Sequence, residues 1–395
     1  MSDPASLMRE RVQLYKDAAR HKKTSRVLNV ANMWNWIVYD SGYKLSEALF
    51  DYGKMEDALF KFQEKYQFDY YNDYGIRNPL RVQSALGHTD YIVNDEANAL
   101  NIQDINYMEP EDYDDILENY FKFLWTKYMP RKYPQANSSE SKAMMLNACQ
   151  EFAQFGQYVG NINQQFVVKY GVPPALGFGT PAFVVFYEIL FNFIRGIRGL
   201  SIDIRQRPEK VKAVCDALRT VSIGPGPTFA AFKAASQHGT DMNRGPDLFM
   251  VFLGHTILSK KQFEVYYWPY LKEVFDFTEQ YDKILHIFAE GENSRLYDFY
   301  KEAPKGHVVI HLEMDDMFRA KKELGDTVCL CGGMPVDLLY HGTRQENIDY
   351  AKRLIDELAA DGGFMFSQNK MVSYPNDCKA ENLKAVNDFV RGYTL

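Results

Sequence analysis

The feature that most limits the fold of this chain is a regular alternation of short apolar runs with longer amphipathic segments. Apolar runs that end in Gly or a polar residue, separated by charged segments of helical spacing, are typical of buried parallel strands joined by helices. Eight runs have this character: 26–30, 68–73, 174–179, 246–254, 283–291, 307–313, 327–333 and 362–367. Eight units favour a closed (β/α)8 barrel over a doubly wound sheet, and the GxGxxG and Walker A phosphate loops are both missing from the sequence.

The segments between the runs predict helices. Segment 208–219 begins with Pro, 259–281 begins with a Ser cap, and 347–360 ends before a Gly pair. About a hundred residues separate the second and third runs, more than a strand-to-helix connection needs. We therefore expect one α/β domain over residues 1–395: a (β/α)8 TIM barrel with an N-terminal helical extension and a helical insertion, 80–165, between strands 2 and 3. Segment 112–128 of the insertion has helical spacing.

Composition narrows the class of protein. The 52 acidic residues exceed the 45 basic ones, and no Lys/Arg run forms a basic face, so nucleic acid is not an expected partner. Five Cys without a CxxC pair favour a reducing, cytoplasmic setting. The most apolar stretch, 178–194, is interrupted by Glu188 and Asn192, so no membrane-spanning helix is expected.

Several motifs resemble those of the uroporphyrinogen decarboxylase superfamily. Gly179-Thr-Pro-Ala-Phe183 followed by Tyr187 resembles the Gly-x-Pro turn and active-site Tyr of that family. Later landmarks follow in the same order: the helix at 259–270, His286, Cys331-Gly-Gly333, 342–343, 362–364 and 381–382. The resemblance implies a (β/α)8 barrel, a homodimer, and one of two chemistries. One branch decarboxylates a tetrapyrrole without a cofactor; the other moves methyl groups to or from a corrinoid or coenzyme M, usually with zinc.

Two departures from the family pattern bear on the choice between these branches. The decarboxylases carry an Arg-rich segment after the first strand, whereas this chain has Asn32, Trp34 and Trp36 there. An aromatic wall suits a flat or apolar ligand and cannot neutralise a ring of carboxylates. The His-x-Cys pair and late Cys of the zinc branch are replaced by His286-Ile-Phe288 and Gln368-Asn-Lys370, so a thiolate–zinc site of that form is absent.

The ends of the fifth and sixth runs concentrate the residues that can carry chemistry. In a barrel of this kind, catalytic groups stand at the C-terminal ends of strands. Imidazole and carboxylate groups on adjacent strand ends can bind zinc through one nitrogen and two oxygens. We assign such a metal to His286, Glu290 and Glu313, and we add Glu292 and His311 as catalytic candidates. His311 and Glu313 share one strand face, so both should point the same way.

Other candidates are weighed against structural roles. Tyr187 and Asp73 are catalytic candidates, and the substrate-binding candidates are Asn32, Trp34, Trp36, Tyr71 and His255. Cys329 and Cys331 share a strand face and could both ligate a metal, but Cys in an apolar run is more often part of the core. A His or Glu at a strand end is also often a hydrogen-bonded structural group.

These observations favour a methyltransferase. It would move a methyl group from a small methylated molecule, of the methoxylated aromatic kind, to a corrinoid on a separate protein, because the chain has no Asp-x-His-x-x-Gly corrinoid signature. A metal, or an acid such as Glu290 or Tyr187, would stabilise the leaving oxygen. One alternative is a metal-free decarboxylase or other lyase that uses Asp73 and Tyr187, with carboxylate partners among Arg77, Arg81 and Arg131. Another is a binding protein that kept the barrel without the chemistry.

Overall fold

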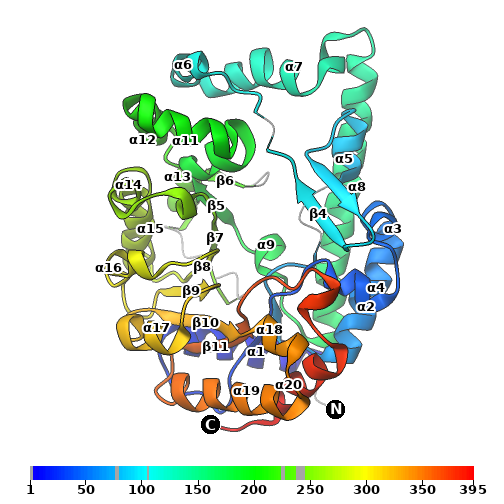
Figure 1. Cartoon of the computed structure of the whole chain (residues 1–395), viewed down its shortest axis with the longest axis vertical. Coiled ribbons are helices and arrows are strands. Elements are labelled where there is room, and N and C mark those ends of the chain that lie inside the picture. The colour runs from blue at the N-terminus through cyan, green and yellow to red at the C-terminus, as the bar shows by residue number, and fades with distance from the viewer. Residues whose placement is uncertain (1–2, 76–79, 105, 224–226, 237–244) are drawn as a thin grey trace.

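The computed structural model describes residues 3–75, 80–104, 106–223, 227–236 and 245–395, and its centre is a curved sheet (Figure 1). The nine strands of this sheet follow the order β2-β1-β11-β10-β9-β8-β7-β5-β6. All pair in parallel except β6, which is antiparallel to β5. The strands are β1 Asn29–Ala31, β2 Tyr70–Tyr71, β5 Ala182–Val185, β6 Thr220–Ser222, β7 Leu248–Phe252, β8 Leu285–Ala289, β9 Val308–Leu312, β10 Cys329–Met334 and β11 Phe364–Gln368.

The eight parallel strands follow the order of a (β/α)8 barrel, as the alternation of runs predicts. Within the described residues no ladder joins β2 to β5, so the barrel is open on that side. The short helix α9 (Leu176–Gly179) crosses the opening, where the Gly177 N–H donates to the Asn72 carbonyl at 3.0 Å. A backbone hydrogen bond thus replaces a strand pairing at this point.

The third predicted strand is the one misplaced element of the barrel. Segment 174–179 was expected to be a strand, but it contains α9, and the strand is β5, a few residues later. Pro173 and Pro174 bring no N–H to a ladder, whereas β5 contains Phe and two Val, which favour strands. The other seven predicted runs each overlap a parallel strand.

The helices pack mainly on the outside of the sheet. They are α1 Pro4–Ala19, α2 Trp36–Ser41, α3 Leu45–Phe50, α4 Tyr52–Tyr66, α5 Leu80–Ala85, α6 Tyr113–Phe123, α7 Met129–Lys132, α8 Ser141–Gln165, α10 Phe186–Ile189, α11 Gly196–Gln206, α12 Pro208–Leu218, α13 Phe229–Ser236, α14 Lys260–Tyr266, α15 Trp268–Gln280, α16 Tyr297–Tyr300, α17 Met317–Leu324, α18 Val336–His341, α19 Arg344–Leu358 and α20 Ala380–Gly392. The single helix expected over 259–281 is divided into α14 and α15 because Pro269 brings no N–H at the junction.

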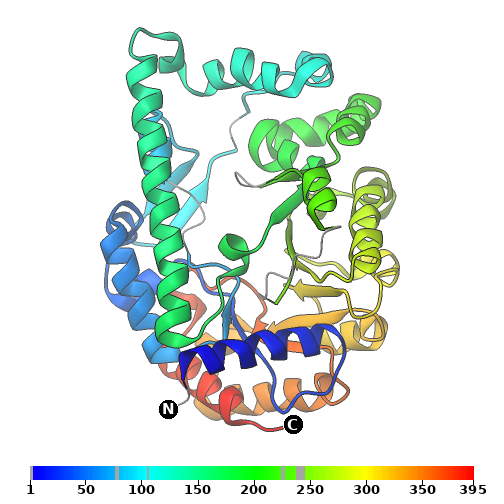
Figure 2. The same ribbon diagram turned by 180° about the vertical axis from the view of Figure 1, so that it is seen from behind.

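The N-terminal helix α1 closes the end of the barrel where the strands begin. Its residues Leu14, Tyr15 and Ala18 form one apolar cluster with the inward-facing residues at the starts of the strands, such as Leu28 and Ile284. Figure 2 shows α1 lying across this end. The strands therefore open toward the opposite face, which is the one seen in Figure 1.

The insertion at 80–165 contains α5, α6, α7 and α8, and also a hairpin of β3 (Tyr91–Asn94) and β4 (Ala99–Ile102) that the sequence did not predict. Figure 1 and Figure 2 show α8 standing along one side of the barrel, with α6 and α7 extending from its far end. Among the described helices, none is both long and apolar enough to cross a membrane.

Candidate functional site

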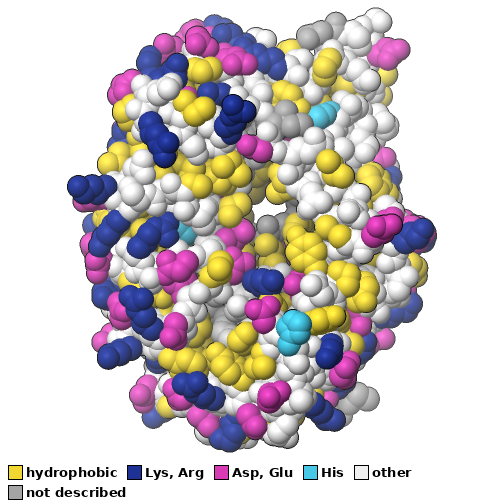
Figure 3. Space-filling model, viewed as in Figure 1, with side chains coloured by type: hydrophobic (Ala, Val, Ile, Leu, Met, Phe, Trp, Pro, Cys, Tyr) yellow, Lys and Arg dark blue, Asp and Glu magenta, His cyan; other side chains and the backbone are white. Residues whose placement is uncertain are grey.

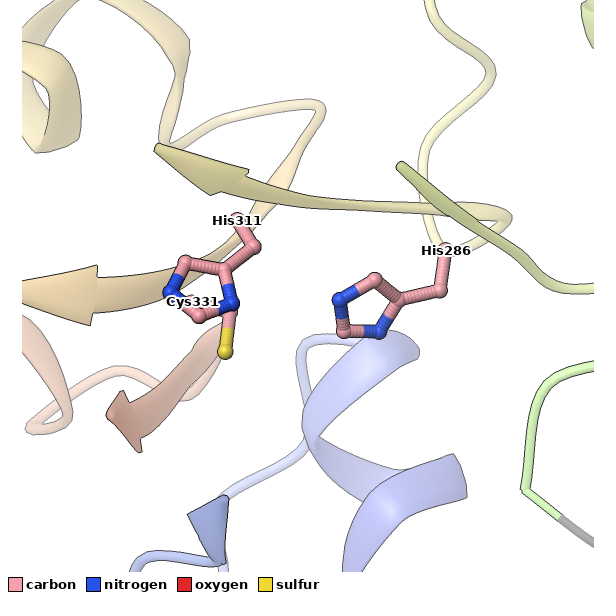
Figure 4. Close-up of side chains that lie close together, drawn as sticks. All are labelled: His286, His311 and Cys331. Carbon is pink, nitrogen blue, oxygen red and sulfur yellow. The ribbon is translucent and has the colours of Figure 1, made fainter. Parts of the chain in front are cut away.

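Three adjacent strands place nitrogen and sulfur ligands close together inside the barrel. His286 is on β8, His311 on β9 and Cys331 on β10, and all three side chains are fully buried. His311 and Cys331 are register partners, and one ligand atom of each of the three residues lies within 4.8 Å of the other two. Figure 4 shows a nitrogen of the His286 ring directed toward His311, with the Cys331 sulfur next to the His311 ring.

Hydrogen bonds fix the orientation of both imidazoles. His311 Nε2 lies 2.9 Å from the Gln368 carbonyl, which can only accept, so this nitrogen carries the proton. His311 Nδ1 then accepts from the Asn72 amide at 2.9 Å. His286 Nδ1 bonds the Tyr15 hydroxyl at 2.7 Å, while His286 Nε2 is buried without a hydrogen-bond partner.

Burial keeps the three groups uncharged. It lowers the pKa of His311 to about 4. Burial, with His311 as a lesser cause, also lowers the pKa of His286 well below its usual value. Burial raises the pKa of the Cys331 thiol well above its usual value. Both imidazoles are therefore neutral at physiological pH, and each keeps one nitrogen lone pair.

This trio fits a zinc ion. Imidazole nitrogen and thiolate sulfur are the ligands that zinc prefers. Metal-ligating histidines usually donate their second ring N–H to a carbonyl or carboxylate, as His311 does to Gln368. The partnerless Nε2 of His286 offers a second ligand atom. A metal on Nδ1 of His311 would replace the hydrogen bond from Asn72.

Neutral polar side chains at the ends of β1, β2 and β11 adjoin the trio. Asn72 donates to both His311 Nδ1 and Asn32 Oδ1, the latter at 3.2 Å. Ser367 follows the inward-facing Met365 by two residues on β11, so its hydroxyl also faces inward. Asn32 Nδ2, Asn72 Oδ1 and Ser367 Oγ are all buried without hydrogen-bond partners. Figure 3 shows that the molecule is hollowed at the centre of this face, with acidic side chains beside the hollow.

Within the described residues, the side chains grouped with His286 are His311 and Cys331. The expected zinc ligands Glu290 and Glu313 are not part of this group. Glu313 lies just after β9, where its Oε2 accepts from the Gly291 N–H at 2.6 Å. Glu290 directly follows β8. Both carboxylates thus belong to the strand ends at the mouth, whereas His286 is the second residue of its strand and lies deeper.

Several expected site residues lie outside the barrel interior, among the side chains that pack between sheet and helices. Tyr187 is fully buried, and its ring stacks on Tyr266 with 5.8 Å between centroids. Burial raises its pKa, and its hydroxyl has no hydrogen-bond partner. Trp36 begins α2 and packs on Phe62. The other two, Tyr71 and His255, bond Gln63 Oε1 at 2.7 Å and Asn293 Oδ1 at 2.8 Å.

The remaining expected residues lie at or near the mouth. Asp73 accepts from the Gly75 N–H at 2.7 Å, and Trp34 is half-buried beside Gly75. Glu292 is exposed and accepts from the Ser294 N–H at 2.8 Å. Asn32 lies inside the barrel, where its side-chain oxygen accepts from the Asn72 amide.

Two of the three cations named for a carboxylate substrate, Arg81 and Arg131, belong to the insertion. Arg81 pairs with Glu151 at 2.7 Å, and Arg131 pairs with Asp112. Arg77 falls outside the described residues.

Sequence reasoning missed Glu188, the residue after Tyr187. Its carboxyl group is buried and accepts from the N–H groups of Leu253 and Gly254 at 2.8 and 2.9 Å. Burial raises its pKa to about 8, and nearby Glu290 contributes in the same direction. A lone Glu inside the apolar stretch 178–194 was the available signal, because a buried carboxyl group needs a specific reason.

The fold and the inward-facing site define a (β/α)8 barrel that gathers buried polar groups in its interior. The chain belongs to the uroporphyrinogen decarboxylase family, whose model matches residues 169–393, more than half of the chain. A search of curated proteins found no match. Among solved structures, the chain is similar to a methyltransferase from Methanosarcina mazei, with a TM-score of 0.58 and 12% identity over 96% of this chain and 98% of that chain. This likeness concerns the fold. Family and fold together are those of enzymes of the decarboxylase or methyltransferase type.

Proposed function

We propose that this protein is a methyltransferase that takes a methyl group from a small uncharged molecule, of the methoxylated aromatic class, and passes it to a corrinoid on a separate protein. The observation that carries this proposal is the neutrality of the barrel. None of the residues in its eight parallel strands is Asp, Glu, Lys or Arg. A ring of substrate carboxylates would need cationic partners there, because burying unpaired charge is very costly.

Zinc is part of the proposal, with His286, His311 and Cys331 as its ligands. When bound, zinc would act as a Lewis acid that stabilises the charge on the leaving oxygen. Where no metal is bound, an acid at the mouth, such as Glu290 or Glu313 at the ends of β8 and β9, would stabilise that oxygen instead. The corrinoid protein would dock over the face opposite α1, because that is where the strands end.

Metal-free decarboxylation is the second candidate. What favours it is the hydrogen bond from Asn72 to His311 Nδ1, which occupies the nitrogen that a metal would need. Asp73, next to Asn72 in the chain, is then the acid–base candidate.

Metal analysis of matched variants tests the zinc ligands. We expect about one zinc per chain in the wild type. Cys331→Ser should lose it, and Cys329→Ser, two residues earlier on the same strand face, should retain it. Loss in Glu290→Ala and Glu313→Ala with retention in Cys331→Ser would instead support the ligand set expected from the sequence.

Methyl transfer is assayed with methoxybenzenes and reduced cobalamin, whose absorption spectrum changes when it is methylated. Transfer by the zinc-loaded wild type and its loss in Cys331→Ser are the expected results. A protein that binds no added zinc and releases carbon dioxide from a carboxylated substrate would favour the second candidate.

A further inference from the structure

We infer that Asn32 and Asn72 select a neutral ligand that presents a hydrogen-bond donor beside an acceptor, the arrangement of a hydroxyl group next to an ether oxygen. This inference deepens the proposed function and rests on it in one respect, since it takes the barrel interior to be where the methylated molecule binds. The argument depends on which atoms of the two amides remain available.

The orientation of the amides follows from one backbone carbonyl. Because the Gln368 carbonyl can only accept, His311 must donate to it from Nε2, and its Nδ1 is left as an acceptor. Without a metal on Nδ1, the Asn72 group that faces this nitrogen must therefore be its NH2 group. The same NH2 group reaches the side chain of Asn32, whose facing atom must be the oxygen. The hydrogen-bond network thus removes the usual ambiguity between amide oxygen and nitrogen.

Two atoms of opposite character remain. Asn72 Oδ1 is an acceptor and Asn32 Nδ2 is a donor, and neither has a partner. Asn32 is 1% exposed and Asn72 is 6% exposed, so bulk water does not satisfy them. Leaving a buried polar atom unpaired costs about 1–3 kcal/mol, and natural proteins leave few of them. The two amides are hydrogen-bonded to each other, so one small ligand can reach both available atoms.

The Asn32 donor and the Asn72 acceptor also indicate which ligands the site excludes. A carboxylate has only acceptors and would place one beside Asn72 Oδ1, while an ammonium group has only donors and would place one beside Asn32 Nδ2. No charged residue in the strands offsets either mismatch. A neutral group with one donor and one acceptor satisfies both amides, and the Ser367 hydroxyl offers a further contact that adapts to either role.

Calorimetric binding to the full-length protein tests this inference with three probes of similar size. The protein is first freed of metal with a chelator, because zinc on His311 Nδ1 would displace the Asn72 amide. These probes are 2-methoxyphenol, with a donor beside its ether oxygen, methoxybenzene, without the donor, and 2-methoxybenzoate, with a charged acceptor. We expect the wild type to bind 2-methoxyphenol about tenfold more tightly than methoxybenzene, the usual value of one buried hydrogen bond, and to bind the benzoate most weakly. Equal affinities for the first two probes would overturn the inference and leave ordered water as the partner of both amides.

Two variants locate the effect. Asn72→Leu removes the acceptor and should weaken binding of 2-methoxyphenol to the level of methoxybenzene, without changing methoxybenzene. Asn32→Leu removes the donor and should weaken both. If Asn72→Leu weakens both probes equally, the donor of the ligand does not meet Asn72 and the inference fails. The wild-type comparison remains valid if a variant does not fold.

The inference about the amides and the proposed methyl transfer can be disproved independently. Selective binding of 2-methoxyphenol without any methyl transfer to cobalamin would contradict the proposed function but support the inference about the amides. Methyl transfer from methoxybenzene and 2-methoxyphenol with equal affinity would do the reverse.

Discussion

Two clusters of buried polar side chains, one at each end of the barrel, are hydrogen-bonded in opposite ways. At the end closed by α1, the buried Asp69 carboxylate accepts from Arg11 Nε at 2.9 Å, from Arg26 at 2.6 Å and from the Asn29 N–H at 3.1 Å. At the other end, the uncharged Asn32 and Asn72 each keep a buried polar atom without a partner. The buried carboxylate at the first end is fully paired, whereas the buried amides at the second end are uncharged but incompletely bonded.

This difference separates stability from binding. A paired charge serves the fold, because its partners come from the chain itself, here from α1 and the segment before β1. A buried neutral group without a hydrogen-bond partner destabilises the fold, and a bound ligand can supply the missing hydrogen bond. The arrangement agrees with the general division of these barrels, in which the N-terminal ends of the strands provide stability and the C-terminal ends provide chemistry.

Replacing Asp69 with Asn should give the largest effect. Burial alone would raise the pKa of Asp69, but Arg26 and Arg11 together hold it below its usual range. Asp69→Asn leaves both guanidinium groups without their shared carboxylate, and we expect a loss of about 3–5 kcal/mol in the free energy of unfolding, measured in urea. Because the folded pKa is depressed, the contribution of the wild-type carboxylate is present above its unfolded pKa and is lost as pH falls through the folded value. A variant as stable as the wild type would show that this end does not depend on the ion pairs.

Glu188→Gln probes a buried carboxyl group that is held by backbone N–H groups rather than by a cation. The pKa of Glu188 rises from 4.5 to about 8 on burial, so the folded protein keeps a proton that the unfolded chain releases. Wild-type stability should therefore fall as the pH rises from about 4.5 to 8. In Glu188→Gln this part of the fall should disappear, a difference of a few kcal/mol between the two pH limits. Urea unfolding at pH 5, 7 and 9 measures it, and identical pH profiles would show that another group titrates.

Gly332→Ala tests how tightly the chain packs around His311 inside the barrel. Gly332 has a φ of +121°, and a Cβ atom there would lie 2.9 Å from the Leu312 carbonyl oxygen and 3.2 Å from His311 Cδ2. We expect a loss of roughly 1–3 kcal/mol in the free energy of unfolding, because an L side chain is strained at this φ. The displaced His311 ring should also weaken zinc binding. A variant with unchanged zinc affinity would show that the position of His311 does not matter to the metal.

The fold was predictable because it depends on a repeated pattern. Seven apolar runs overlap parallel strands, and α12 and α19 lie within two or three residues of their expected bounds. The third strand was wrong because the prediction followed the apolar residues and gave too little weight to Pro173 and Pro174. The hairpin of β3 and β4 was missed because neither strand shows a clear alternation of apolar and polar residues.

The site was harder to predict because a sequence pattern does not fix strand register. His286 and His311 were both named, but as members of different groups, and the structure brings them together with Cys331. The apolar neighbours of Cys331 favour a core residue, and the side chain is indeed buried. They do not reveal that Cys331 lies opposite His311 on the next strand. Asn72 is not among the candidates predicted from the sequence, although its neighbour Asp73 is. A shift of one residue along a strand moves a side chain to the other face, so such errors are expected.

Glu292→Gln should give the smallest effect. It tests whether the exposed loop after β8 takes part in the reaction. Glu292 is a catalytic candidate by sequence, yet it is exposed, and its carboxylate accepts from the Ser294 N–H two residues away. A Gln oxygen can accept the same hydrogen bond, so we expect a change below about 0.5 kcal/mol in the free energy of unfolding. Methyl transfer should also be unchanged, measured beside the wild type with the same corrinoid. A loss of activity with normal stability would place the reacting atoms at the exposed loop after β8 rather than at the amides inside the barrel.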